Sequence, residues 1–231
     1  GKDAFKKVLR YHEDFKDVKP ISQVHAMPDI AKQFSFTDDS KYWMMNEERF
    51  LHCIIMTAIA ADKGFQASIE KIASNFGMSK QDKTFQPAAP KSFVRANNKR
   101  FADYRNYTKP RTGFNLDVNR NLCVCTLERT IPFFEALLEK FKGAVKVKFL
   151  YDLPYGEREE RFHLCSIMLT VVYEPGTTFK QLTSTSEAKD LLDDYCSKPI
   201  GIPAERWEEH TLDARQILTN SCSKVRIFGE I

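Results

Sequence analysis

The sequence predicts an α+β protein, in which a helical N-terminal region precedes a β-sheet with flanking helices. Three observations lead to this prediction. Residues 3–77 show helical spacing of apolar residues, residues 144–173 and 223–231 contain strand-like runs, and amphipathic helical segments stand between the strand-like ones. The chain has 231 residues, of which 42% are hydrophobic and 29% charged, a composition typical of globular proteins.

The first expected helix covers residues 4–15. Apolar residues recur there at helical spacing, and Asp3 has the side chain of an N-cap. Pro20 and Pro28 interrupt the segment that follows, because proline removes a backbone donor and clashes with the preceding turn of a helix.

Two further helices are expected before residue 78. Asn46 is the predicted N-cap of a strongly apolar helix over 47–62, which Gly64 is expected to end. An amphipathic helix follows over 66–77. The polar, proline-containing residues 78–89 read as a linker or loop.

After residue 90, helical and strand-like patterns alternate. This change divides the chain into a predicted helical N-terminal region, 1–85, and a predicted α+β domain, 86–231. The domain is expected to contain helices over 91–104, 130–143, 178–201 and 206–218, and strands over 113–127, 144–153, 162–173 and 223–231.

The lengths of the apolar runs and the spacing of the cysteines argue against two classes of protein, membrane-spanning proteins and structural zinc proteins. No apolar run approaches the roughly 18–20 residues that cross a bilayer, so no membrane segment is expected. The six cysteines do not form CxxC pairs, which argues against a structural zinc site. We interpret them as reduced thiols, which predicts an intracellular and cytoplasmic protein.

The positive charge is concentrated in residues 90–120. This stretch holds eight Lys and Arg residues against Asp103 and Asp117, a net +6, whereas the whole chain is +4 and the other residues therefore sum to −2. If 91–104 is helical, Lys91, Arg95 and Lys99 share one face at i, i+4 and i+8. Such a face binds phosphate, to which Ser92 adds a hydroxyl, or it is simply a solvated basic face.

Asp117 stands in the predicted strand "FNLDVNRNLCVC" with apolar neighbours. Alternation places it on one face with Asn119. A carboxylate on a strand near a basic helix is what Mg²⁺-dependent phosphoryl transfer requires, because the metal neutralises charge on a triphosphate. A structural aspartate paired with Arg120 or with the basic helix is the alternative, and the residues alone do not decide between them.

The order of these motifs resembles the synthetase domain of RelA/SpoT-type alarmone synthetases, in the nucleotidyltransferase superfamily. "PKSFVRANNKRFADY" and "LDVNR" are similar to motifs of a divergent group of that family, and the resemblance covers about residues 65–231. It implies a mixed β-sheet of nucleotidyltransferase type. It also implies transfer of pyrophosphate from ATP to the 3′-hydroxyl of GDP or GTP, with Lys91, Arg95 and Lys99 on the donor triphosphate.

The resemblance also implies a partner for Asp117. The family's second acidic residue lies in a terminal strand that reads "EIQ", to which "KVRIFGEI" is similar, so that Glu230 would share Mg²⁺ with Asp117 or act as general base. Residues 177–223 then form a helical insertion. His163 stands where the family has a guanine-stacking tyrosine, and the family's "D..G.R" appears as "DVNRN", with Arg120 two positions early.

Two functions therefore remain open. One is Mg²⁺-dependent pyrophosphoryl or nucleotidyl transfer from a nucleoside triphosphate to a nucleotide hydroxyl. The other is a catalytically inactive module of the same fold, which binds a nucleotide or RNA through its basic face and through Phe93, Tyr104 and Tyr107.

Overall fold

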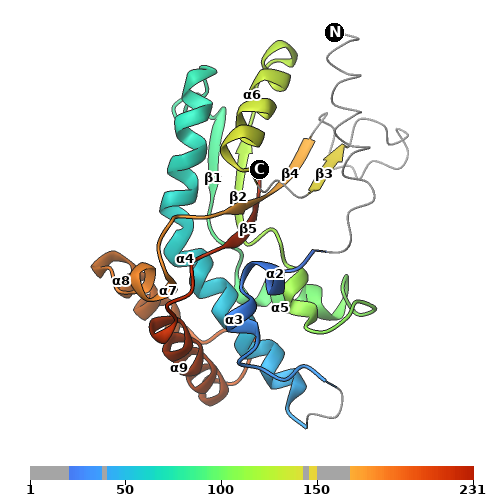
Figure 1. Ribbon diagram of the computed structural model, residues 1–231, viewed down its shortest axis with the longest axis vertical. Helices are drawn as coiled ribbons and strands as arrows, with labels where there is room; N and C mark the ends of the chain where they lie inside the picture. The colour runs from blue at the N-terminus through green and yellow to red at the C-terminus, as the bar shows by residue number, and fades with distance from the viewer. Residues whose placement is uncertain (1–20, 38–40, 143–145, 150–166) are drawn as a thin grey trace.

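The computed structural model describes residues 21–37, 41–142, 146–149 and 167–231 (Figure 1). The predicted α+β class is confirmed, because helices surround a five-stranded mixed sheet. The helix expected over 4–15 and the first part of the strand expected over 162–173 lie outside the described residues.

The long helix α4 (Trp43–Asn75) runs through the molecule and contacts most of its other elements (Figure 1). The two helices expected over 47–62 and 66–77 are parts of it, so the prediction that Gly64 ends a helix was wrong. A Cβ at Gly64 would collide with the hydroxyl of Tyr173. The glycine is therefore used for close packing and not as a helix end, at a cost in helix propensity of about 1 kcal/mol.

The start of α4 also differs from the prediction. The helix begins at Trp43, and Asn46 lies in its first turn, where its side-chain amide donates a hydrogen bond of 2.8 Å to the carbonyl oxygen of Ser35. Asn46 thus ties the preceding segment to the helix and does not cap it.

The strand β1 (Phe85–Ala88) lies in the segment that was expected to be a linker. It occupies one edge of the sheet and pairs antiparallel with β2 (Asn119–Cys123), while the side chain of Phe85 is buried in the core. An edge strand tolerates Pro87, because a residue without an N–H can face away from the ladder. Four residues with one proline gave too short a pattern to predict.

The sheet has the strand order β1-β2-β5-β4-β3. β5 (Ile227–Glu230) runs parallel to β2 and antiparallel to β4 (Ile167–Tyr173), which pairs antiparallel with β3 (Lys146–Phe149). The four predicted strands are therefore present, and β2 and β5, whose expected ranges are fully described, are shorter than expected. A Cβ at Gly229 would lie 2.9 Å from the ring of Phe65, so glycine lets β5 pass close beneath α4.

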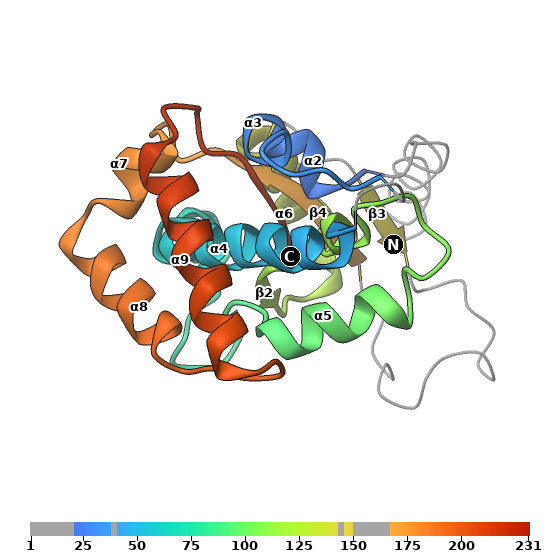
Figure 2. The ribbon, with the colours of Figure 1, turned by 90° about the horizontal axis from the view of Figure 1, so that it is seen from below.

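Helices cover the sheet and extend the core around α4 (Figures 1 and 2). One continuous core contains Phe65 of α4, Val171 of β4 and Leu218 of the last helix, and the boundary expected between residues 85 and 86 falls inside β1. The remaining helices are α2 (Gln23–Ala26), α3 (Pro28–Ala31), α5 (Phe93–Phe101), the 3₁₀ helix η1 (Arg111–Phe114), α6 (Leu127–Lys140), α7 (Phe179–Thr183), α8 (Ser186–Cys196) and α9 (Ala204–Asn220).

The expected helical insertion, 177–223, corresponds to α7, α8 and α9, all of which pack against α4. Across the described ranges, the search for a helix long and apolar enough to cross a membrane finds none.

Candidate functional site

Asp117 lies in the segment that joins η1 to β2, two residues before the strand begins. Both of its carboxylate oxygens accept hydrogen bonds from Lys91, whose Nζ lies 2.7 Å from Oδ1 and 2.8 Å from Oδ2. Lys99 Nζ approaches Oδ2 at 3.3 Å. We call these three residues the Asp117 cluster.

The two lysines reach Asp117 from different segments. α5 begins at Phe93, so the prediction that Lys91, Arg95 and Lys99 share one helical face was wrong: Lys91 precedes the helix. Its backbone N–H donates a 2.8 Å hydrogen bond to the carbonyl oxygen of Val118, which holds its side chain beside Asp117. Lys99 comes from the last turns of α5.

Ser92 and Arg95 lie at the start of α5, as its N-cap and in its first turn. Ser92 is the N-cap, and its hydroxyl accepts from the backbone N–H of Arg95 at 3.5 Å. The side chain of Arg95 is exposed, one helical turn before Lys99. A basic side chain and a hydroxyl are thus accessible next to the Asp117 cluster.

Burial and charge shape the titration of the Asp117 cluster. Burial lowers the pKa of Lys91 to about 8, although the attraction of Asp117 opposes the shift. Burial raises the pKa of Asp117, but the two lysines outweigh this effect and hold the pKa below its usual value. Burial also opposes the charged form of Lys99, whose pKa Asp117 nevertheless raises. At neutral pH the cluster therefore carries one excess positive charge.

An aromatic group lies beside Lys99. The rings of Tyr104 and Phe114 are 6.0 Å apart, and Tyr107 lies 4.7 Å from Phe114. Burial raises the pKa of Tyr104 to about 12, while the charge of Lys99 opposes the shift. Phe93 is not part of this group, because it is buried against His52 in the core.

Glu230 and Arg120 lie side by side on neighbouring parallel strands. Arg120 is three residues beyond Asp117, and the strand begins only at Asn119, so the strand pairing places Glu230 beside Arg120 and not beside Asp117. The guanidinium of Arg120 donates a 3.2 Å hydrogen bond to the carbonyl oxygen of Ala89, whereas the ion pairs described for Asp117 are those with Lys91 and Lys99. The shared Mg²⁺ site of Asp117 and Glu230 stays a prediction.

Asp117 is the one group of the Asp117 cluster that could bind a metal ion, and its contacts fit an ion that is brought by the substrate better than a resident one. Both oxygens of Asp117 already accept from ammonium groups, so a resident divalent ion would have to displace a lysine. Mg²⁺ often binds through one or two carboxylates together with substrate phosphates, which would attract the partly exposed Lys99 away from Asp117. The described residues contain no group of three or more His, Cys, Asp or Glu side chains placed to hold a metal ion.

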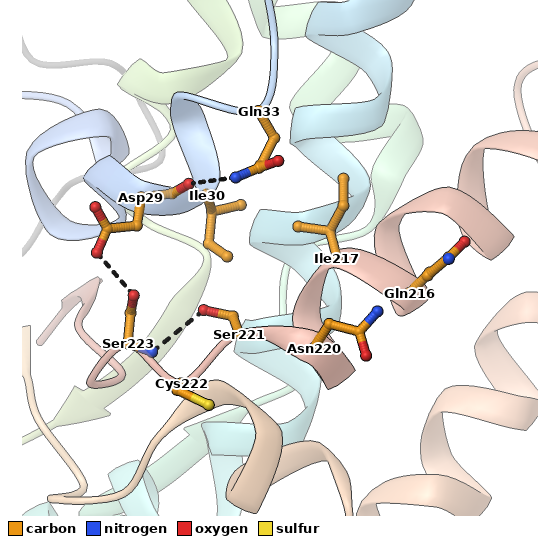
Figure 3. Close-up of a pocket in the computed structure, with 9 residues that line it drawn as sticks. All are labelled: Asp29, Ile30, Gln33, Gln216, Ile217, Asn220, Ser221, Cys222 and Ser223. Atoms are coloured by element: carbon orange, nitrogen blue, oxygen red, sulfur yellow. Dashed lines mark hydrogen bonds between the residues drawn. The ribbon is translucent and has the colours of Figure 1, made fainter.

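Two other features lie apart from the Asp117 cluster. His163, the predicted substitute for a stacking tyrosine, is outside the described residues. A cavity of about 400 Å³ lies between α3, the end of α9 and residues 221–223, where the hydroxyl of Ser223 donates to Asp29 (Figure 3). Its lining comes from elements other than those that carry Asp117, Lys91 and Lys99.

Comparison of the chain with protein families, with curated proteins and with solved structures finds no match. The functional proposals below therefore depend on the chain's own residues and on the motif resemblance.

Sequence reasoning found the members of the Asp117 cluster but missed two aromatic residues, Phe114 and Trp43. Phe114 was assigned to a strand, and Trp43 was placed before the expected helix. Lys109 Nζ lies 3.6 Å from the centre of the Trp43 ring, a contact between residues 66 positions apart that no local pattern indicates. The excess of basic residues in 90–120 was the only available signal.

Proposed function

We propose that the chain binds a nucleoside triphosphate as its Mg²⁺ complex at the Asp117 cluster. It transfers a pyrophosphoryl or nucleotidyl group from that donor to a hydroxyl of a nucleotide acceptor. The observation that carries the proposal is the convergence of two ammonium groups, from separate segments, on one partly exposed carboxylate. Such a donor would place the protein in an intracellular compartment.

The charges of the cluster favour a phosphate ligand. The side chain of Lys99 is 35% exposed, so it can turn to a ligand, whereas Lys91 is buried and holds Asp117 in place. Arg95 extends the basic surface by one helical turn. Charge-assisted hydrogen bonds from lysine and arginine to phosphate are among the stronger polar contacts in proteins.

The proposed roles follow from these positions. Lys99 and Arg95 bind the donor phosphates, with Ser92 as an additional hydroxyl. Asp117 meets the Mg²⁺ that the substrate brings, and that ion neutralises charge on the phosphates when bound. Glu230 accepts the proton of the attacking hydroxyl, and Arg120, its neighbour in register, binds a phosphate of the acceptor.

One observation favours a second candidate function, a nucleotide-binding module without catalysis. Both oxygens of Asp117 are occupied by lysines, and Glu230 pairs with Arg120, three residues further along the chain than Asp117. In a module of this kind Asp117 would only position the lysines, and the nucleotide would bind without reacting.

A binding measurement followed by a product assay tests both candidates. We expect titration calorimetry to detect MgATP or MgGTP, with at least about tenfold weaker affinity in Lys99→Ala, the loss of one charged hydrogen bond. Lys189→Ala, at an exposed position on α8, is the matched control and should bind normally. Incubation with ATP, GTP and Mg²⁺ should give a new nucleotide on ion-exchange chromatography, and Asp117→Asn should abolish it.

The outcomes separate the two candidates. Binding without product would replace the transferase by the binding module. Absence of nucleotide binding, or equal affinity in Lys99→Ala and Lys189→Ala, would overturn both.

A further inference from the structure

The exposed aromatic rings of the described chain gather at one end of the molecule. Tyr42, Phe101 and Tyr107 are 54%, 51% and 46% exposed. Tyr42 precedes α4, Phe101 ends α5, and Tyr107 lies in the loop between α5 and η1. Elsewhere in the described chain the large exposed apolar side chains are aliphatic, so aromatic exposure is specific to this end.

Direct contacts join these segments into one surface. Lys109, in the loop after α5, lies over the ring of Trp43 in the first turn of α4. Arg100 lies 4.3 Å from the centre of the Phe101 ring and donates a 3.2 Å hydrogen bond to the carbonyl oxygen of Met44. Figure 2 views the molecule from the end where α4 begins, with α5 alongside. We call Tyr42, Trp43, Phe101, Tyr107 and Lys109 the aromatic–basic surface.

The α5 side of the aromatic–basic surface is rich in basic residues. Residues 91–111 contain seven basic residues and one acidic residue, Asp103. Arg100 and Arg111 pair with buried glutamates of α4. Exposed basic side chains nevertheless remain on both segments, Lys41 before α4 and Arg105 after α5. The ammonium of Lys41 also lies 5.7 Å from the Tyr42 ring centre.

We propose that the aromatic–basic surface binds single-stranded nucleic acid. Exposed rings offer stacking partners for unpaired bases, and the neighbouring cations neutralise the backbone phosphates. A duplex hides the faces of its bases, so it would use the cations without the rings. An acidic polypeptide would likewise need the positive charge only. The proposal goes beyond the proposed function, whose ligands are mononucleotides at the Asp117 cluster.

Fluorescence anisotropy with labelled 15-nucleotide oligo-U, oligo-dT and a duplex of the same length tests the proposal. We expect both single strands to bind more tightly than the duplex, with affinity that falls as salt rises. Phe101→Ala and Tyr42→Ala should each weaken single-strand binding about 5- to 150-fold, the range for loss of one stacked base. Leu212→Ala on α9, at an exposed apolar position away from this surface, is the matched control.

The variants also separate this surface from the Asp117 cluster. Phe101→Ala should keep its affinity for MgATP, and Asp117→Asn should keep its affinity for oligo-U. A preference for oligo-U over oligo-dT would identify RNA as the ligand. Tighter binding of duplex, equal competition by polyglutamate, or unchanged affinity in both ring variants would overturn the proposal, because each shows that the rings do not contact bases.

Discussion

Lys99 and Arg100 are neighbours on α5, yet their side chains enter two different charge clusters. Lys99 reaches the Asp117 cluster, which has one carboxylate, two ammonium groups and an edge open to solvent. Arg100 reaches a buried network around Glu47 and Glu48 of α4. The same short helix therefore carries a candidate binding group and a structural group at adjacent positions.

The buried network joins four elements. Arg100 lies 3.6 Å from Glu47 Oε2 and 3.2 Å from Glu48 Oε1. Arg111 of η1 pairs with Glu47 at 3.4 Å, and two groups of α9, Arg206 and His210, lie 3.5 and 3.6 Å from Glu48 Oε2. Three guanidinium groups face two carboxylates, so this network also carries one excess positive charge, but the Arg100–Glu47 pair at its centre is buried, with side chains 2% and 0% exposed.

The comparison shows that exposure, and neither ion pairing nor charge excess as such, marks a candidate site. Short carboxylate–cation contacts occur in both clusters. A buried, matched pair is costly to break, since the remaining charge is left in a medium of low polarity. An accessible cluster with excess charge can exchange its internal contacts for a ligand at little cost.

The largest expected effect is on the buried network. Arg100→Met should lower the free energy of unfolding by about 3–5 kcal/mol, because it leaves Glu47 and Glu48 short of a buried partner. Urea denaturation followed by circular dichroism measures the loss. Arg105→Ala, at an exposed position after α5, should change stability by less than about 0.5 kcal/mol. Equal stability of the two variants would contradict the structural role of Arg100.

The network should also make stability depend on pH. Burial lowers the pKa of His52 to about 3 and that of His210 to about 4, helped by the charges of His210 and of Arg49 respectively. In the unfolded chain histidine titrates near 6.5. Between pH ~6.5 and ~4 the unfolded state therefore binds more protons than the folded state. As the pH is lowered through this range, the free energy of unfolding falls by up to about 1.4 kcal/mol per pH unit for each histidine.

Urea denaturation at a series of pH values checks this dependence. The groups that face His210 are Glu48, Arg49, His52, Arg206 and Glu209, and His52 also faces Tyr195. His210→Met should flatten the slope between pH 6.5 and 4 relative to the unchanged chain. A slope that the substitution leaves unaltered would show that His210 does not stay neutral in the fold.

Substitution of the two lysines of the Asp117 cluster should affect protein stability to different degrees, although both substitutions should weaken MgATP binding. Lys91→Met removes a buried partner of Asp117 and should cost about 1–3 kcal/mol. Lys99→Ala, at a partly exposed position, should cost less than about 1 kcal/mol. Both should weaken MgATP binding in calorimetry. A Lys91 variant with full stability and a Lys99 variant with full affinity would together exclude the division of roles proposed for them.

The smallest effect on stability is expected for an ion pair in which both side chains are exposed. Lys63 and Glu187 approach within 2.9 Å, with side chains 78% and 59% exposed. Lys63→Ala should change stability by less than about 0.5 kcal/mol, although the contact is as short as those of Asp117. A larger loss would mean that distance, and not burial, decides the contribution of these pairs.

Local sequence patterns determined much of the fold. Apolar spacing located the strongly helical part of α4, the helices α6, α8 and α9, and the strands β2 to β5, since each of these has a periodic or continuous apolar run. The charge excess in 90–120 likewise indicated the region that holds Asp117, Lys91 and Lys99. These features depend on residues close together in the chain.

Tertiary contacts decided the rest. Gly64 stays helical because Tyr173 needs the space of its missing Cβ, and β1 forms because β2 offers it a partner and the core accepts Phe85. The hydrogen bond from Lys91 to Val118 places Lys91 outside the helix, so the two lysines meet Asp117 from different segments. Arg100 and Lys99 have similar local surroundings, and only the packing of α5 against α4 separates a buried structural cation from an accessible one.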